Sequence, residues 1–342
     1  MKSQSVAKML AIVGLTVGLF VISTHAWADD SSSDSTNSSP TNVSQADVSD
    51  QVNQQKQKNA QNANDVDKLI TNNELRALSG AKSKWSMSNA VDYYGGTVAS
   101  PLGAERPDIT GGSGNTVNSY LEDQASVKYN LNNTNSLSAG IGLRWIAPTS
   151  PTGPVNYNGT TFDAVNPTLT YQNIANIHGV QSIFDAGFMQ YTQADMTALG
   201  YGQNYSVSET AEYAFGKLTV GTVFYAQYNS FDKSGSLFDK NQNQMVSLLT
   251  QQSQTGVFVY PLLEYQLTDK LNFRTITGAL QYEHYRNQAN LNTYTEDTWY
   301  QSVGISYSVT RDIFLYPNVQ FLPEHAAADL TNVALAAYIN VF

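Results

Sequence analysis

Apolar and polar residues alternate along long stretches of the chain from Trp85 onward. Residues 119–147 give the clearest example, because apolar side chains occupy alternate positions on both sides of a turn at 132–136. Successive side chains of a β-strand point to opposite faces, so the pattern predicts strands with one apolar face and one small or polar face. Each stretch has roughly 11 to 14 residues, whereas strands of soluble sandwiches have about five or six. The pattern therefore favours strands that cross a membrane over a soluble β-sandwich.

The alternation recurs often enough to form about twelve strands, an even number that suits a closed bacterial barrel. Short turns are expected near residues 132–136, 175–179, 216–217, 268–270 and 310–312, and long connections near 98–118, 148–164, 194–204, 229–252 and 287–297. Barrels of the bacterial outer membrane have short periplasmic turns and longer external loops. We therefore predict an all-β transmembrane antiparallel barrel of about 12 strands over residues 81–342, with both termini periplasmic.

Composition agrees with such a barrel and narrows the classes of function. Charged residues make up 13% of the chain, against about 25% in soluble domains, and tyrosine is abundant with 21 copies. The absence of cysteine excludes disulfide scaffolds, thiol catalysis and thiolate metal sites. A net charge of −10 argues against nucleic acid as a partner.

The first 28 residues have the layout of a secretory leader. Lys2 and Lys8 precede an apolar stretch that ends at the small-x-small sequence Ala26-Trp27-Ala28. The alternative is a membrane anchor helix, but the stretch is shorter than the roughly 20 residues that a span needs. We predict a cleaved signal peptide over residues 1–28 and export to the bacterial outer membrane. The polar residues 29–47 are expected to be disordered.

Residues 48–80 are predicted to form a periplasmic helical segment with a coiled-coil seam. The seam positions follow a 4-3 spacing and are Val48, Val52, Gln55, Asn59, Asn62, Val66 and Leu69. Its polar middle would set register and oligomer state at a cost in stability. The segment is therefore a candidate homo-oligomerisation element, and a solvated linker that is only partly helical is the alternative.

Charged residues on the predicted inner face would line the lumen. They are Glu122, Lys128, Arg144, Asp185, Glu212, Glu264, Arg274, His284 and Arg286. In an open pore, separated acids and bases would set selectivity, with Arg144, Arg274, Glu122 and Glu264 as the main candidates. In a closed lumen the same charges would pair and fill the interior. Glu209 and Glu283 fall on the predicted outer face, where a position near the external rim or a subunit contact would be needed to accommodate them.

The sequence contains no recognisable catalytic or metal-binding motif. The mature chain has three histidines, none in a recognisable nucleophile motif, and no G-x-S-x-G sequence is present. The acidic segments lack an EF-hand pattern. We therefore predict no catalytic residue, no metal site, no cofactor and no enzymatic activity.

The whole layout resembles porin-like outer-membrane proteins. The chain ends in Phe342 on a final amphipathic strand that also carries Tyr338. This ending resembles the signal that such proteins present to the barrel-assembly machinery, although Asn340 interrupts the pattern. The run from Ile70 to Trp85, with the seam before it, is similar to porin-like proteins of predatory bacteria. That resemblance implies ring-shaped homo-oligomers that enclose membrane lipid.

Two functions remain open at this point. One is a porin-like barrel, homo-oligomeric, that passes ions or small polar solutes. The other is a non-conducting structural barrel whose ring-shaped oligomer encloses and organises membrane lipid.

Overall fold

The computed structural model describes residues 66–109, 116–155, 161–239, 244–296 and 298–341. Strands that form the wall are β1 (Trp85–Thr97), β4 (Tyr120–Asn130), β5 (Asn135–Ile146), β6 (Phe162–Ile177), β7 (Val180–Gln190), β8 (Tyr201–Phe215), β9 (Leu218–Phe231), β12 (Ser253–Gln266), β13 (Leu271–Gly278), β14 (Leu280–Tyr285), β16 (Tyr300–Thr310), β17 (Ile313–Phe321) and β18 (Asn332–Val341). Neighbouring wall strands are antiparallel, and β18 pairs with β1.

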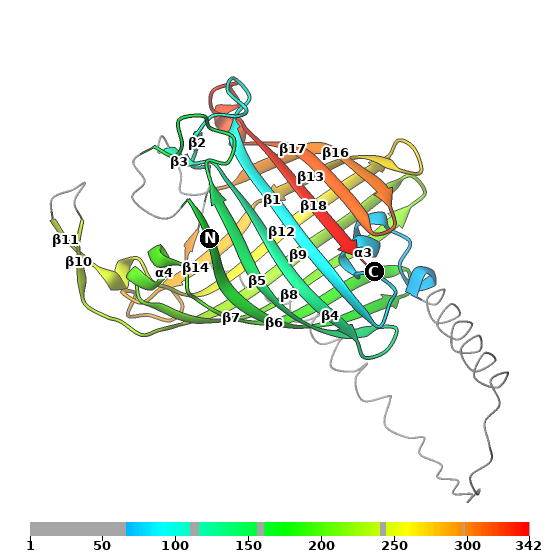
Figure 1. The fold of residues 1–342 in the computed structure, drawn as a ribbon, viewed down its shortest axis with the longest axis horizontal. Helices are drawn as coiled ribbons and strands as arrows, with labels where there is room; N and C mark the ends of the chain where they lie inside the picture. The colour runs from blue at the N-terminus through cyan, green and yellow to red at the C-terminus, as the bar shows by residue number, and fades with distance from the viewer. Residues whose placement is uncertain (1–65, 110–115, 156–160, 240–243, 297, 342) are drawn as a thin grey trace, which may run out of the picture. The chain divides into compact units, whose positions relative to one another are not determined.

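Pairing between β12 and β13 closes the sheet into a ring. With β13 and β14 counted as one interrupted strand, the ring has twelve strands (Figure 1). The predicted closed antiparallel barrel of twelve strands is confirmed. Closure gives the described wall strands a paired neighbour on each side, which removes the long open edges that a sheet exposed to lipid cannot have.

The interruption between β13 and β14 changes which face the following residues occupy. Leu262 pairs with Ile276, but Phe258 pairs with Gln281, so one extra residue lies at the break near Ala279. A one-residue shift moves the subsequent side chains to the opposite face. Glu283 therefore shares the inner face with Gln281, and His284 shares the outer face with Tyr282. The predicted lumenal position of His284 and outer position of Glu283 are wrong for this reason.

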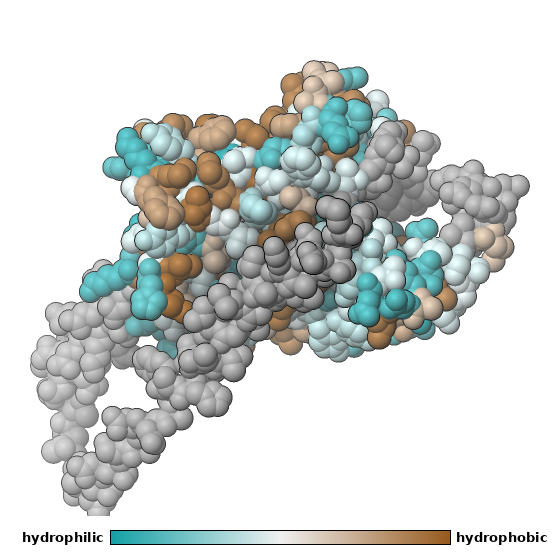
Figure 2. Space-filling model, turned by 180° about the vertical axis from the view of Figure 1, so that it is seen from behind, coloured by the Kyte–Doolittle hydropathy of each residue, from teal (hydrophilic) through white to brown (hydrophobic). Residues whose placement is uncertain are grey.

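The outer surface of the ring is apolar. Exposed apolar residues on this surface include Val127 of β4, Leu137 and Ile141 of β5, Val220 and Tyr228 of β9, and Ile305 and Tyr307 of β16. In the view from behind, apolar side chains are exposed on the visible part of the wall, interspersed with polar ones (Figure 2). This distribution is typical of a barrel that spans a membrane. Among the described residues, no helix is long and apolar enough to cross one.

Glu209 is the exception on this outer surface. The sequence places it near the external rim, but β8 begins at Tyr201, so Glu209 lies near the middle of the strand. It pairs with Phe184 on one side and Phe224 on the other. The prediction of a rim position was wrong because the strand extends further than the alternation alone indicated.

The long connections carry the remaining described elements. They are β2 (Glu105–Pro107), β3 (Thr116–Asn118), α4 (Ala194–Ala198), β10 (Ser236–Asp239), β11 (Gln244–Ser247), η2 (Leu248–Thr250), β15 (Thr295–Glu296) and η3 (Pro323–His325). β2 pairs with β3, and β10 pairs with β11 in a separate hairpin. Helix α3 (Asn73–Leu78) precedes the first wall strand and contacts β7, β17 and β18. It lies at the barrel end that carries the short turns (Figure 1).

Candidate functional site

Residues 66–84 enter the short-turn end of the barrel, and we call this segment the plug. Its helix α3 starts at Asn72, whose side-chain oxygen accepts hydrogen bonds from the backbone N–H groups of Glu74 and Leu75 at 2.7 and 3.1 Å. Such a cap satisfies amide groups that have no partner inside a helix. A helix of six residues has little stability of its own, so its contacts with the wall must hold it.

Two apolar clusters fix the plug to opposite parts of the wall. Ile70 and Leu75 pack with Ile174 of β6 and Ile183 of β7, and all four are at least nine-tenths buried. On the other side of the helix, Ala77 packs against Phe314 and Tyr316 of β17, with Tyr338 of β18 beside them. Burial of this area stabilises docking in proportion to the apolar surface removed from water.

Polar side chains of the wall bind the backbone where α3 ends. Asn340 of β18 donates to the carbonyl of Ala77 at 2.7 Å, and Arg311 donates to the carbonyl of Gly80 at 2.8 Å. Lys128 of β4, which is 5% exposed, donates to the carbonyl of Ser79 and to the Gln172 side chain. Cationic and amide donors are favourable at a helix C-terminus, because its last carbonyl groups have no partner inside the helix.

Residues before α3 are held in the same way at its other end. The Gln181 side-chain oxygen accepts from the backbone N–H groups of Thr71 and Asn72, and its amide nitrogen donates to the Thr71 hydroxyl at 2.9 Å. Asn176 donates to the carbonyl of Leu69 at 2.7 Å. The wall therefore supplies partners for the plug backbone on both sides of the helix.

Asp67 anchors the start of the plug through two cations. Its carboxylate pairs with Lys82 of the plug and accepts a hydrogen bond from Arg311 at 2.9 Å. Partial burial raises the pKa of Asp67, but the hydrogen bonds and charges of Lys82 and Arg311 outweigh it, so the pKa lies below its ordinary value. Asp67 is consequently ionised at neutral pH, when the anchor is complete.

At the centre of the plug interface, one guanidinium meets three carboxylates. Arg274 of β13 pairs with Glu74 of α3 and with Glu264 of β12 at 2.6 Å, while Glu212 of β8 lies 4.0 Å away. All four residues are at most 6% exposed. The Tyr316 ring covers the guanidinium at 5.4 Å. A single positive charge therefore faces three acidic groups in a site removed from water.

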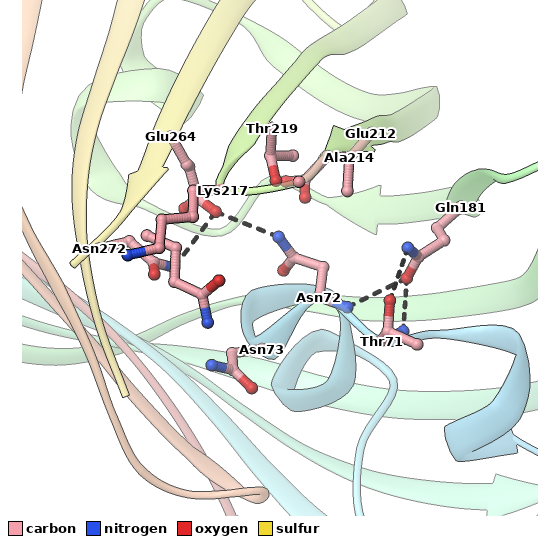
Figure 3. A pocket seen from close by; sticks show the side chains of 12 residues that line it. Thr71, Asn72, Asn73, Gln181, Glu212, Ala214, Lys217, Thr219, Glu264 and Asn272 are labelled. Atoms are coloured by element: carbon pink, nitrogen blue, oxygen red, sulfur yellow. Dashed lines mark hydrogen bonds between the residues drawn. The ribbon is translucent and has the colours of Figure 1, made fainter. Parts of the chain in front are cut away.

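A small polar cavity of about 170 Å³ adjoins this cluster. Its lining combines the helix cap with residues of β7, β8, β9, β12 and β13: Thr71, Asn72, Asn73, Gln181, Glu212, Ala214, Gly216, Lys217, Thr219, Glu264, Gln266 and Asn272. The Asn72 amide donates to Glu264 across the cavity at 3.1 Å (Figure 3). Gly221 of β9 leaves room for the acid beside it, because a Cβ there would lie 2.8 Å from the Cγ of Glu212.

The opposite end of the lumen is narrowed by a connection rather than by the plug. Arg106 of β2, 5% exposed, donates to Gln320 of β17 at 3.1 Å and lies over the Tyr94 ring of β1 at 5.1 Å. Tyr94 in turn stacks on Tyr120 of β4 at 4.6 Å between ring centroids. Arginine and aromatic side chains thus occupy the interior near the long connections.

Other predicted lumenal charges belong to other parts of the wall, except that Asp185 lies close to Lys128 and Gln172 beside the plug. Glu122 pairs in register with Arg144, which lies 3.5 Å from Asp195 of α4. Asp185 lies on the β7 face that also carries Ile183. Arg286 follows the end of β14 and donates to Gln252 at 2.6 Å. Of the nine predicted residues, the structure brings Lys128, Glu212, Glu264 and Arg274 to the plug.

The predicted seam and assembly signal lie partly outside the described residues. This applies to Val48, Val52, Gln55, Asn59, Asn62 and Phe342. Val66 and Leu69 pack against the Ile70 and Leu75 cluster. Tyr338 faces the interior and stacks on Phe314 at 6.0 Å.

Sequence reasoning missed the plug residues Asn72 and Glu74 and the loop residue Arg106. The sequence Asn72-Asn73-Glu74 followed by Leu75 and Ala77 does carry a cap signal, which could have indicated a short helix. Nothing in the sequence separates Arg106 from other loop residues, because its partners Tyr94 and Gln320 are remote along the chain.

No protein-family model matches the chain, and no curated protein matches it. Three solved structures illustrate the similarities found. They are a NanC porin (10% identity, 75% of this chain and 100% of the other, TM-score 0.38), a KdgM porin in complex with disordered oligogalacturonate (9%, 75% and 99%, 0.38) and the COG4313 outer membrane channel from Pseudomonas putida F1 (11%, 77% and 98%, 0.40). Similarity at this level does not identify a function, which has to come from the lumen itself.

Proposed function

We propose that this chain is an outer-membrane channel for ions or small polar solutes whose lumen its own plug closes from the periplasmic end. One observation supports this proposal most strongly. The outer surface is apolar, whereas the interior is charged and its residues Arg274, Glu264 and Lys128 bind the plug. Buried charges are costly, and their retention in the wall is expected where the interior faces water once the plug leaves.

The contacts that hold the plug are of a kind that would allow it to leave the lumen. Its contacts with the wall are two small apolar clusters, two ion pairs and a set of hydrogen bonds, and they form no continuous core. When the plug leaves, water can replace the hydrogen bonds that Lys128, Gln181 and Asn340 donate or accept. The wall is closed by strand pairing alone, so it does not depend on the plug for its edges.

Single-channel recording on the full-length protein tests the proposal. The chain has no cysteine, so Ala77→Cys and Phe314→Cys, which replace residues in contact, can be bridged by a short cleavable thiol reagent. We expect bridging to suppress openings and cleavage to restore them. Each single cysteine variant, treated with the same reagent, is the matched control. Equal conductance before and after bridging would contradict closure by the plug.

The proposed location follows from the same features. A leader over residues 1–28 directs export, the barrel-assembly machinery recognises the final strand that ends in Phe342, and both termini lie in the periplasm. Protease added to intact cells should then leave residues 66–84 uncut, whereas protease admitted to the periplasm should reach the segment before them.

A second function is favoured by the position of Glu209. A carboxylate near the middle of a lipid-facing strand costs free energy, and contact with another subunit would remove it from lipid. This supports a homo-oligomeric ring that encloses membrane lipid, the function implied by the resemblance to porin-like proteins of predatory bacteria. Residues 48–69 would then contribute to assembly.

The mass of the detergent-extracted protein distinguishes the two functions. We expect a single homo-oligomer for the ring, one that loses subunits when residues 29–65 are deleted and the plug is left intact. Bound lipid can be quantified on the same sample. If both the intact protein and the deletion variant are monomers, the ring-forming function is rejected and the channel function remains.

A further inference from the structure

The Glu212 carboxyl group lies inside the barrel, and no group of the described residues donates a hydrogen bond to it. The residue is 1% exposed, and neither side-chain oxygen accepts a hydrogen bond from any described residue. The other two acids of the cluster are satisfied. Glu264 accepts from Arg274, Asn72 and Asn272, and Glu74 accepts from Arg274. A buried ionised carboxylate with no donor is strongly unfavourable, so Glu212 needs a proton or another partner.

Three of the elements packed against Glu212 carry a charged residue that faces it. Glu74 faces it from α3, Glu264 from β12 and Arg274 from β13, while Lys217 of the β8–β9 turn lines the same cavity. The β7 residue opposite in register is the neutral Gln181. Arg274 is already engaged by Glu74 and by Glu264 at 2.6 Å, and its distance to Glu212 is 4.0 Å. An ionised Glu212 would therefore meet two carboxylates and a guanidinium that is shared with both.

Glu74 is the member of this cluster that the plug contributes. When the plug leaves, Glu74 leaves with it, and Glu212 faces the adjoining cavity as part of the wall. The like charge of Glu74 is then gone, Arg274 has only Glu264 left as a partner, and water can hydrate the Glu212 carboxylate, so Glu212 ionises at a lower cost. Glu212 therefore favours the protonated form when the plug is docked and the ionised form when the plug is released.

We propose that plug docking is proton-linked, with the docked state holding a proton on Glu212 that can be donated to Glu74 and the released state giving it up. This inference rests on the proposed function for its biological meaning, but docking can be measured without any conductance. Since the docked state binds the additional proton, raising the pH favours release. One linked proton changes the docking equilibrium by at most about tenfold per pH unit.

Thiol labelling in the full-length protein tests the proposal. Ala77, a residue of the plug that is 2% exposed where it packs against the wall, is replaced by cysteine, and its labelling rate by a maleimide is measured from pH 5 to pH 8. Leu291→Cys, at a loop position that is 74% exposed, corrects for the pH dependence of thiol reactivity itself. We expect the ratio of the two rates to rise with pH, by more than tenfold across the range.

Glu212→Gln separates proton linkage from general effects of pH. The amide is neutral at all pH values and keeps the shape of the protonated acid, so the ratio should stay at its low-pH value throughout. Glu209→Gln is the matched control, since it lies on the same strand with its side chain on the opposite face, and it should keep the wild-type pH dependence.

Two results would overturn the proposal: a ratio that does not change with pH in the wild-type background, or a full pH dependence that persists in Glu212→Gln. A channel that never conducts, combined with a pH-dependent labelling ratio, would remove the proposed function and leave the proton linkage. A protein that conducts but has a pH-independent labelling ratio would remove the proton linkage and leave the proposed channel function.

Discussion

Arg274 of β13 and Glu74 of α3 form a buried ion pair although they lie 200 positions apart in the sequence. The pair joins the wall of the barrel to the helix that occupies its short-turn end. Glu264 binds the same guanidinium from the adjacent strand, directly opposite Arg274 in register. Arg274 therefore has Glu264 as a partner within the wall, and it gains Glu74 as a second partner only when the helix is docked.

Replacing Arg274 with alanine should release the plug, because the buried carboxylates of Glu74 and Glu264 would face each other, beside the protonated Glu212, without a counter-charge. Breaking a buried ion pair costs about 3–5 kcal/mol, or roughly a hundredfold to several thousandfold in the docking equilibrium. Faster maleimide labelling of Ala77→Cys measures this release. Arg144→Ala is the control, since Arg144 pairs with the exposed Asp195. Equal labelling in the two variants would argue against the central role of Arg274.

Asn72 has two functions that substitutions can separate. Serine keeps an oxygen to cap α3 but loses the amide that donates to Glu264, whereas alanine loses both. Alanine at a cap costs about 1 kcal/mol, so Asn72→Ala should exchange the amide hydrogens of residues 73–78 several-fold faster than Asn72→Ser. Hydrogen exchange measured by mass spectrometry gives the comparison. Identical exchange would mean that the cap does not stabilise the docked helix.

Enlarging Ala77 should weaken docking by steric overlap. Its side chain contacts Phe314 and Tyr316 in a fully buried cluster, and overpacking of this kind costs about 1–3 kcal/mol. Ala77→Leu is therefore expected to expose the plug to protease, as seen by faster cleavage after Lys82 and Lys84. Leu78→Met, a volume-conserving change in the same helix, should leave the cleavage rate close to that of the wild type.

Strong acid should loosen the start of the plug. The pKa of Asp67 is lowered by Lys82 and Arg311, so the stability that it contributes is present above the ordinary Asp value and is lost as the pH falls through the lowered one. Exchange of the amide hydrogens of residues 66–70 should accelerate below about pH 4. Asp67→Asn should abolish this acid-dependent step. The effect is opposite in sign to the release at higher pH expected from Glu212, and it lies in a separate pH range.

The alternation of residues was enough to predict the barrel and most of its inner face. Lys128, Glu212, Glu264 and Arg274 all occupy positions that period two assigns to one side of their strands, because the pleat forces this alternation wherever pairing is regular. His284 and Glu283 were assigned wrongly because the extra residue near Ala279 reverses the faces. A break of this kind arises from the geometry of closure and leaves no clear trace in the local sequence.

Sequence by itself determined the antiparallel strands, their apolar outer surface and a charged interior, because these depend on local periodicity. Tertiary structure alone decided what the charges contact. Glu74 reaches Arg274, Gln181 reaches Thr71 and Arg106 reaches Gln320 across separations of more than 100 residues. Such contacts are set when the ring closes and the plug enters it, so the partner of each buried charge depends on the curvature and register of the whole barrel rather than on its neighbours in the chain.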